Sequence, residues 1–68
     1  MHRKRITVWF TNGDSHVLVV DYNPATGRTI VKTGEDRILR FGRNDGNGWR
    51  ELLAAPETSV LYWNGGGS

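Results

Sequence analysis

The sequence predicts an all-β fold: a small five-stranded antiparallel barrel or meander with one short helical turn before the last strand. Short runs rich in β-branched and aromatic residues recur along the 68-residue chain, and turn sequences containing glycine or proline separate them. Only one segment has the apolar spacing of a helix, and it is too short to be stable unless it packs against a sheet.

The first hairpin is predicted from residues 5–11 and 16–22, which are rich in strand-forming side chains. Asn12-Gly13 lies between them. This dipeptide is the strongest short signal for a type I′ hairpin turn, because both central residues of that turn need positive φ.

The register of this hairpin decides which side chains share a face. A two-residue turn sets Val8 opposite Val17, and a four-residue loop sets Val8 opposite Val19. Both registers predict the same two apolar faces: Ile6, Val8, Phe10, Val17 and Val19 on one, and Thr7, Trp9, Leu18, Val20 and Tyr22 on the other. We therefore expect the first set inside a curled sheet and the second set outside.

The next two strands are predicted at 28–33 and 37–42. The turn before them contains Pro24, which fixes φ, and Gly27, which can adopt the left-handed conformation. Gly34 to Asp36 forms the turn between them. A three-residue loop groups Val31, Leu39 and Phe41 on one face, whereas an even-length loop groups Ile30 with Leu39 and Phe41, so this register is left open.

The C-terminal part is predicted to contain a polar loop at 43–48, a short helix from Trp49 to Ala55 and a last strand at 58–63. Trp49, Leu52 and Leu53 have the spacing of one helical face, and Pro56 ends the helix. The predicted organisation is a flexible basic arm at 1–4, one barrel domain at 5–63 and a flexible Gly/Ser tail at 64–68.

This order of elements resembles that of SH3 domains, in which a helical turn also separates the last two strands. The resemblance covers residues 5–63 and concerns element order, not sequence. It implies a small barrel fold. The acidic and aromatic first loop with which SH3 domains bind proline-rich peptides has no counterpart here, because the first two strands join through a tight turn.

Composition restricts the class of protein. The net charge is +2, with positive zones at 3–5 and 28–50, and seven of the nine basic residues are arginine, a bias that suits a small bacterial or phage accessory protein. No apolar run exceeds four residues, so neither a signal peptide nor a membrane span is expected. The chain contains no cysteine, which agrees with a cytoplasmic location.

Catalytic and metal-binding patterns are weak. Asp14-Ser15-His16 has the residue types of a hydrolase triad, but adjacent strand residues point to opposite faces and cannot converge. Two histidines, His2 and His16, are too few for a zinc site. We therefore expect no enzyme activity, no metal and no cofactor.

Protein binding is the function that the sequence favours. A hairpin with large apolar groups on both faces can bury only one of them inside a barrel. The expected docking surface, for another protein or a second copy of this chain, consists of Trp9, Leu18 and Tyr22 with Arg37 and Arg40 beside them.

Nucleic acid is the alternative partner. Arginine and lysine neutralise phosphates, and exposed aromatic rings stack on unpaired bases. The residues that would serve this function are Arg3, Lys4, Arg5, Arg28, Lys32, Arg37, Arg40, Arg43 and Trp49.

Overall fold

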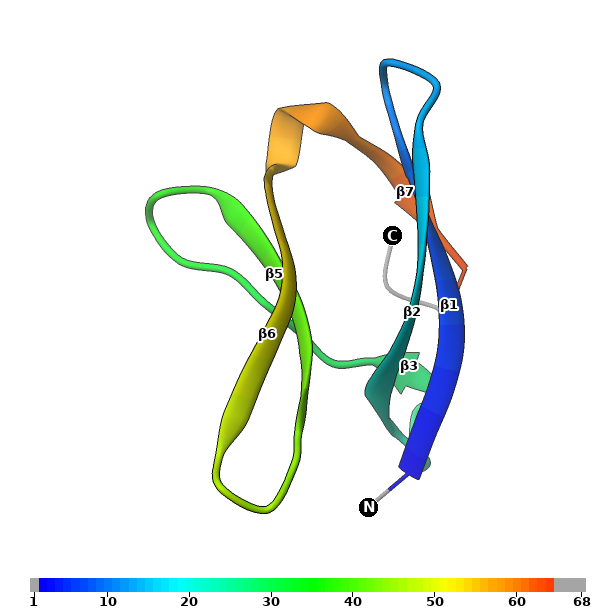
Figure 1. The fold of residues 1–68 in the computed structure, drawn as a ribbon, viewed down its shortest axis with the longest axis vertical. Coiled ribbons are helices and arrows are strands. Elements are labelled where there is room, and N and C mark those ends of the chain that lie inside the picture. Colours follow the sequence, from blue (N-terminus) through cyan, green and yellow to red (C-terminus); the bar gives the residue numbers. More distant parts are fainter. Residues whose placement is uncertain (1, 65–68) are drawn as a thin grey trace.

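The computed structural model describes residues 2–64, which form two antiparallel sheets (Figure 1). The strands are β1 (His2–Phe10), β2 (Ser15–Asn23), β3 (Arg28–Thr29), β4 (Val31–Lys32), β5 (Ile38–Asn44), β6 (Trp49–Pro56) and β7 (Val60–Trp63). A 3-10 turn, η1 (Glu57–Ser59), precedes β7. The first sheet has the order β3-β2-β1-β7 and curls into half a barrel, and the second has the order β4-β5-β6. The all-β class is thus confirmed, and a short helical turn does precede the last strand, although it lies at Glu57–Ser59 and not at the predicted residues 49–55.

The turn between β1 and β2 is not the predicted type I′ turn. Phe10 N–H donates to Asp14 O over 2.9 Å, and Gly13, with φ of 94°, is the only loop residue there with positive φ. This is a type I turn followed by a left-handed glycine, which makes a loop of odd length. The register consequently pairs Val8 with His16, and the predicted register is wrong.

The odd loop exchanges the two faces of β2. Leu18 lies opposite Ile6, on the inner face, and Val20 is fully buried there. Val17 lies opposite Thr7, on the outer face that also carries Trp9, and 62% of it is exposed. The predicted grouping of Trp9 with Leu18 and Tyr22 on one face is therefore wrong, because a one-residue change in register moves every side chain of a strand to the other face.

The predicted third strand is divided between the two sheets. β3 pairs with the end of β2, β4 pairs with β5, and Ile30 lies between them. The N–H of Ile30 donates to Asp21 O over 3.0 Å, which holds the chain at the point where it leaves the first sheet. Val31 lies opposite Phe41, so the grouping of Val31, Leu39 and Phe41 is confirmed.

The predicted helix from Trp49 to Ala55 is wrong, because this segment is strand β6. It pairs with β5 along its length, from Asn44 opposite Trp49 to Ile38 opposite Pro56. Seven residues would make at most about two helical turns, which are marginal alone. Pairing with β5 satisfies the same backbone groups and also brings Ala55 into the core at 8% exposure.

The core lies between the two sheets and is small. Ile6, Val8, Val20 and Phe41 are fully buried, and the ring of Trp63 meets that of Phe41 edge to face, with 5.2 Å between centroids. The half-buried side chains around them are Phe10, Leu18, Val31, Leu39, Leu53 and Val60.

Both ends of the described chain lie in the first sheet. Arg3 and Lys4 belong to β1, opposite Asp21 and Val20, so the basic segment expected as a flexible arm continues the strand. Asn64 follows β7 and exchanges two hydrogen bonds with the backbone of Thr7. The rest of the expected tail, residues 65–68, lies outside the described residues. Within residues 2–64 no helix is long and apolar enough to span a membrane.

Candidate interaction surface

The outer face of the first sheet carries an apolar patch, which we call the outer patch: the exposed side chains of Val17, Val19 and Tyr62 and the half-buried side chain of Trp9. Trp9 lies opposite Tyr62 on neighbouring strands, and their rings stack with centroids 4.6 Å apart and planes 13° apart. Tyr62 is 45% exposed and Val19 is 37% exposed. Apolar side chains gathered on one face mark binding surfaces more often than single exposed ones do.

The outer patch arises because successive side chains along each strand point to opposite faces of the sheet. Inner positions of β1 and β7 hold Val8 and Trp63, which lie opposite each other, and the adjacent outer positions hold Trp9 and Tyr62. Between Trp9 and Phe10 the pairing shifts at a bulge, and Leu61, 64% exposed, lies there beside the patch. Aromatic and β-branched residues thus occupy both faces of these strands, and one face remains outside.

The residues that were expected to accompany Trp9 lie elsewhere. Leu18 is half-buried against the core, and Tyr22 is half-buried with its ring against that of His2 at 5.6 Å. Arg37 lies in the loop before β5, exposed and with φ of 57°. Arg40 is on β5, in the second sheet. Of the five expected residues, only Trp9 therefore belongs to the outer patch.

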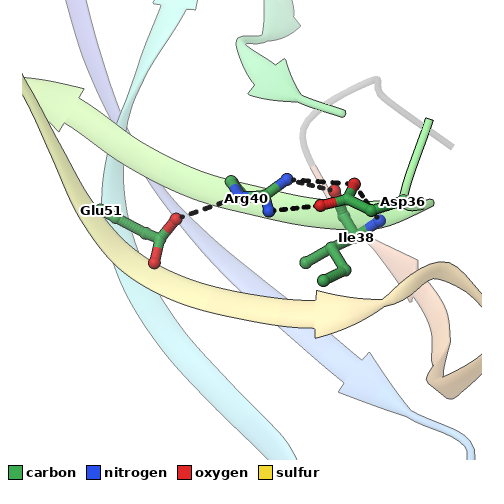
Figure 2. Close-up of polar contacts among 4 residues, drawn as sticks. All are labelled: Asp36, Ile38, Arg40 and Glu51. Atoms are coloured by element: carbon green, nitrogen blue, oxygen red, sulfur yellow. Dashed lines mark hydrogen bonds and ion pairs between the residues drawn. The ribbon is translucent and has the colours of Figure 1, made fainter. Parts of the chain in front are cut away.

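Arg40 is part of a charged cluster on the second sheet. Its Nη2 donates to Asp36 Oδ2 over 2.6 Å, and its Nε lies 3.4 Å from Glu51 Oε1 (Figure 2). The hydrogen bond from Arg40, aided by one from the N–H of Ile38, lowers the pKa of the Asp36 carboxyl, and Asp36 in turn raises the pKa of Arg40. Arg40 is therefore engaged with its own chain.

Lys32 and Trp49 form a second contact on this sheet. The Lys32 ammonium lies 4.2 Å from the centre of the Trp49 ring, a cation–π geometry. Gly42 lies beneath the ring, because a Cβ at that position would come within 2.9 Å of Trp49 Cζ2. Trp49 therefore contacts a lysine within the chain and lies close to the backbone at Gly42.

Arg50 Nη1 lies 4.0 Å from Asp45 Oδ2, and the other basic residues divide into two groups. Arg43 Nη1 donates to Val19 O over 2.9 Å, and Arg3 Nη2 donates to Asn44 O over the same distance, so both link the two sheets. The basic side chains with no ion pair or hydrogen bond among residues 2–64 are Lys4, Arg5, Arg28 and Arg37. Lys4 and Arg5 are adjacent on β1 and so point to opposite faces.

The buried carboxylate of Asp21 joins the sheets at the same place. Asn44 N–H donates to its Oδ2 over 2.8 Å, and Arg3 Nε lies 3.7 Å from its Oδ1. Asp21 is only 3% exposed. We call these three residues the sheet clamp; its role is structural.

Asp14 and His16, which have residue types of a hydrolase triad, make contacts in and beside the first turn. Asp14 lies in the first turn, where its Oδ2 accepts a hydrogen bond from Asn12 Nδ2, and His16 has its ring against Phe10 at 5.5 Å. Residues 2–64 contain no group of three or more residues that could hold a metal ion, and they enclose no pocket.

Sequence reasoning missed Val17, Val19 and Tyr62 of the outer patch. The two valines were missed because the predicted loop length placed them on the inner face. Asn-Gly also occurs in the three-residue loop that the chain adopts. Tyr62 could have been found from the alternation of the last strand against Trp63.

No family model, no curated protein and no solved structure matches this chain. The fold and the outer patch are therefore the observations from which a function can be argued.

Proposed function

We propose that this protein is a non-catalytic binding module that docks another protein on the outer patch. The observation that carries the proposal is the exposed ring of Tyr62, stacked on the half-buried ring of Trp9. Val17 and Val19 are exposed on the same sheet face, which no other strand covers among residues 2–64. Tryptophan and tyrosine are the side chains most often found at the centre of protein interfaces.

The energetics of a small domain support the same proposal. A chain of this size buries only about 60% of the surface that its unfolded state exposes. Large apolar side chains left outside contribute little to such a fold. A partner that covers Val17 and Tyr62 would gain the roughly 25 cal/mol for each Å² of apolar surface that it removes from water.

The proposed module belongs to the SH3-like class of small barrels. In support, β7 returns to pair with β1 after a 3-10 turn, and the strands before it follow one another as a meander. Residues 2–64 form seven strands instead of the five predicted, because the third is broken at Ile30 and residues 49–56 add one more.

Affinity purification with matched variants tests the proposal. Tyr62→Ser removes the exposed half of the stacked pair, and Glu35→Ser changes an exposed loop residue of the second sheet. We expect a partner protein that the wild type and Glu35→Ser retain and that Tyr62→Ser loses. Equal retention by all three proteins contradicts the proposal, as does unfolding of Tyr62→Ser, which would place Tyr62 in the core.

Nucleic acid is the alternative partner, supported by the unpaired side chains of Lys4, Arg5 and Arg28. Fluorescence anisotropy with a labelled single-stranded oligonucleotide separates the two functions. Binding that weakens steeply between about 50 and 200 mM salt, and that Arg5→Ser reduces, favours nucleic acid. The protein-docking proposal expects no such binding.

A further inference from the structure

We propose that two copies of this chain pair through the open edge of β2, antiparallel about Val17, to form one continuous sheet. This inference uses the edge of the first sheet, not its outer face, and it does not depend on the proposed function.

One side of β2 lacks a strand partner over most of its length. β1 pairs with β2 from Ser15 to Tyr22, whereas on the other side β3 pairs only with Tyr22 and Asn23. Within residues 2–64, the segment from Ser15 to Val19 therefore forms a sheet edge on that side. Ser15 and Val17 are also exposed as residues, so this edge is open to solvent.

The backbone groups at this edge can be identified from the alternation of the strand. Asp21 O accepts the N–H of Ile30, so the backbone of Asp21 points away from β1. Hydrogen-bonding direction alternates along a strand, so the backbone of Ser15, Val17 and Val19 points the same way. Val19 O accepts from Arg43, and the other N–H and C=O groups of these residues make no hydrogen bond among residues 2–64.

The chemistry of this edge fits a second copy of itself. Residues 15–20 contain no lysine, arginine, aspartate or glutamate, so antiparallel self-pairing brings no like charges together. Pairing about Val17 sets Val17 opposite its counterpart and Ser15 opposite the partner copy's Val19. The backbone groups that face one another there are unpaired except Val19 O, which accepts from Arg43 and has a second lone pair for the Ser15 N–H of the other copy. Edge strands that stay single usually carry a lysine, a proline or a bulge, and this segment carries none of them.

Pairing would also enlarge the docking face. Val17 and Val19 are the members of the outer patch nearest the edge, because Trp9 and Tyr62 lie on β1 and β7. In the dimer the valines of the two copies adjoin, and the two patches become one. Stable interfaces commonly cover about 800 Å² on each partner, and a doubled patch comes closer to that area.

The oligomeric state of the full chain tests the inference. Light scattering and sedimentation, from micromolar to millimolar concentration, should give twice the 7.7 kDa of one chain for the wild type. Val17→Pro removes the central N–H donor at a position where no bond within the chain uses it, and proline is tolerated at such edges. We expect Val17→Pro to be folded and monomeric, and Val17→Thr, which keeps the N–H and the branched shape, to remain dimeric.

Amide hydrogen exchange provides a second measurement that does not depend on the proline variant. The amides of Val17 and Val19 have no acceptor in the monomer, so their protection should rise with wild-type concentration. A wild type that is monomeric throughout, or a Val17→Pro variant as dimeric as the wild type, overturns the inference. A dimer that Tyr62→Ser dissociates and Val17→Pro does not also overturns it, but leaves docking on the outer patch standing.

Discussion

The outer faces of the two sheets differ in whether their side chains have partners within the chain. On the first sheet, Tyr62 stacks on the half-buried Trp9 and remains exposed, as do Val17 and Val19 on the same face. On the second sheet, Arg40 lies between two carboxylates and the Lys32 ammonium lies over the ring of Trp49, so these charged groups have partners within the chain.

This difference supports the proposed docking of a partner on the first sheet. Charged side chains that pair across a strand face keep water contact and give the face no reason to bind anything else. Exposed aromatic and branched side chains gain free energy only when something covers them. We therefore place the proposed docking surface on the first sheet, since the charged side chains of Arg40, Asp36 and Glu51 on the second sheet already pair with one another.

The largest expected effect on stability comes from a substitution at Gly42, on the second sheet. A Cβ there would overlap the carbonyl oxygen of Arg50 and crowd the Trp49 ring. We expect Gly42→Ala to lower the free energy of unfolding by about 3 kcal/mol or more, because the clash is with backbone that cannot move aside. Urea unfolding measures it. Gly34→Ala is the matched control, since its Cβ would meet only Asp36 Oδ1 at 3.6 Å, and the control should be nearly neutral.

Substitution in the sheet clamp should give the next largest loss in the free energy of unfolding. Asp21→Ala leaves the N–H of Asn44 without its buried acceptor and removes the ion pair with Arg3. We expect a loss of about 2 kcal/mol, in the range for hydrogen bonds to charged groups. Asp21→Asn keeps an acceptor without the charge and should lose less. If both variants are as stable as the wild type, the two sheets are held together by the apolar core alone.

The loop before β5 differs from the hairpin loops of the first sheet in the residue type that adopts positive φ. Both hairpins of the first sheet have glycine at their left-handed position, Gly13 and Gly27, whereas the loop before β5 has Arg37 at φ of 57°. An L-residue with a side chain is strained there. We expect Arg37→Gly to raise the free energy of unfolding by about 0.5–1 kcal/mol after the entropy of glycine in the unfolded chain is counted.

Thermal unfolding is suitable for this small gain, with Arg28→Gly as the control. Arg28 is an exposed arginine in β3 with ordinary strand backbone. The same substitution there should destabilise, because glycine weakens a strand. A stabilisation of equal size at both positions would show that the change in charge, not the backbone, is responsible.

The sequence was sufficient for the fold class and for the turn at Gly27, where a glycine with φ of 72° closes the second hairpin as predicted. It was not sufficient for the outer patch. Whether Val17 or Leu18 points inward depends on a loop length that differs by one residue, and Asn12-Gly13 is compatible with both lengths.

Residues 49–55 show a different reason for failure. Their side chains favour a helix, but the segment lies beside strand β5 (Figure 1). Hydrogen bonds to β5 make it a strand in spite of its helical preference. A local pattern does not contain that information. Likewise, the break at Ile30 depends on Asp21 O, nine positions earlier in the chain, accepting its N–H.

The smallest expected effect concerns the charged cluster of the second sheet and its dependence on pH. The hydrogen bond from Arg40 lowers the pKa of Asp36 in the folded protein below its value in the unfolded chain, about 3.9. The stabilisation from this contact is therefore complete above the unfolded pKa and is lost as the pH falls through the folded pKa. Because Asp36 is exposed, water screens the contact, and the effect is small.

Urea unfolding of the wild type and Asp36→Asn from neutral pH to about pH 2 measures this effect. We expect the wild type to be slightly more stable above about pH 4 and the difference to disappear at the acid end, because the protonated carboxyl no longer attracts Arg40. Glu35→Gln, beside Asp36 but without an ion pair among residues 2–64, should show a smaller change with pH. An identical pH profile for the wild type and Asp36→Asn would mean that the pairing in Figure 2 contributes nothing, and the contrast between the two outer faces would then rest on the Lys32–Trp49 contact alone.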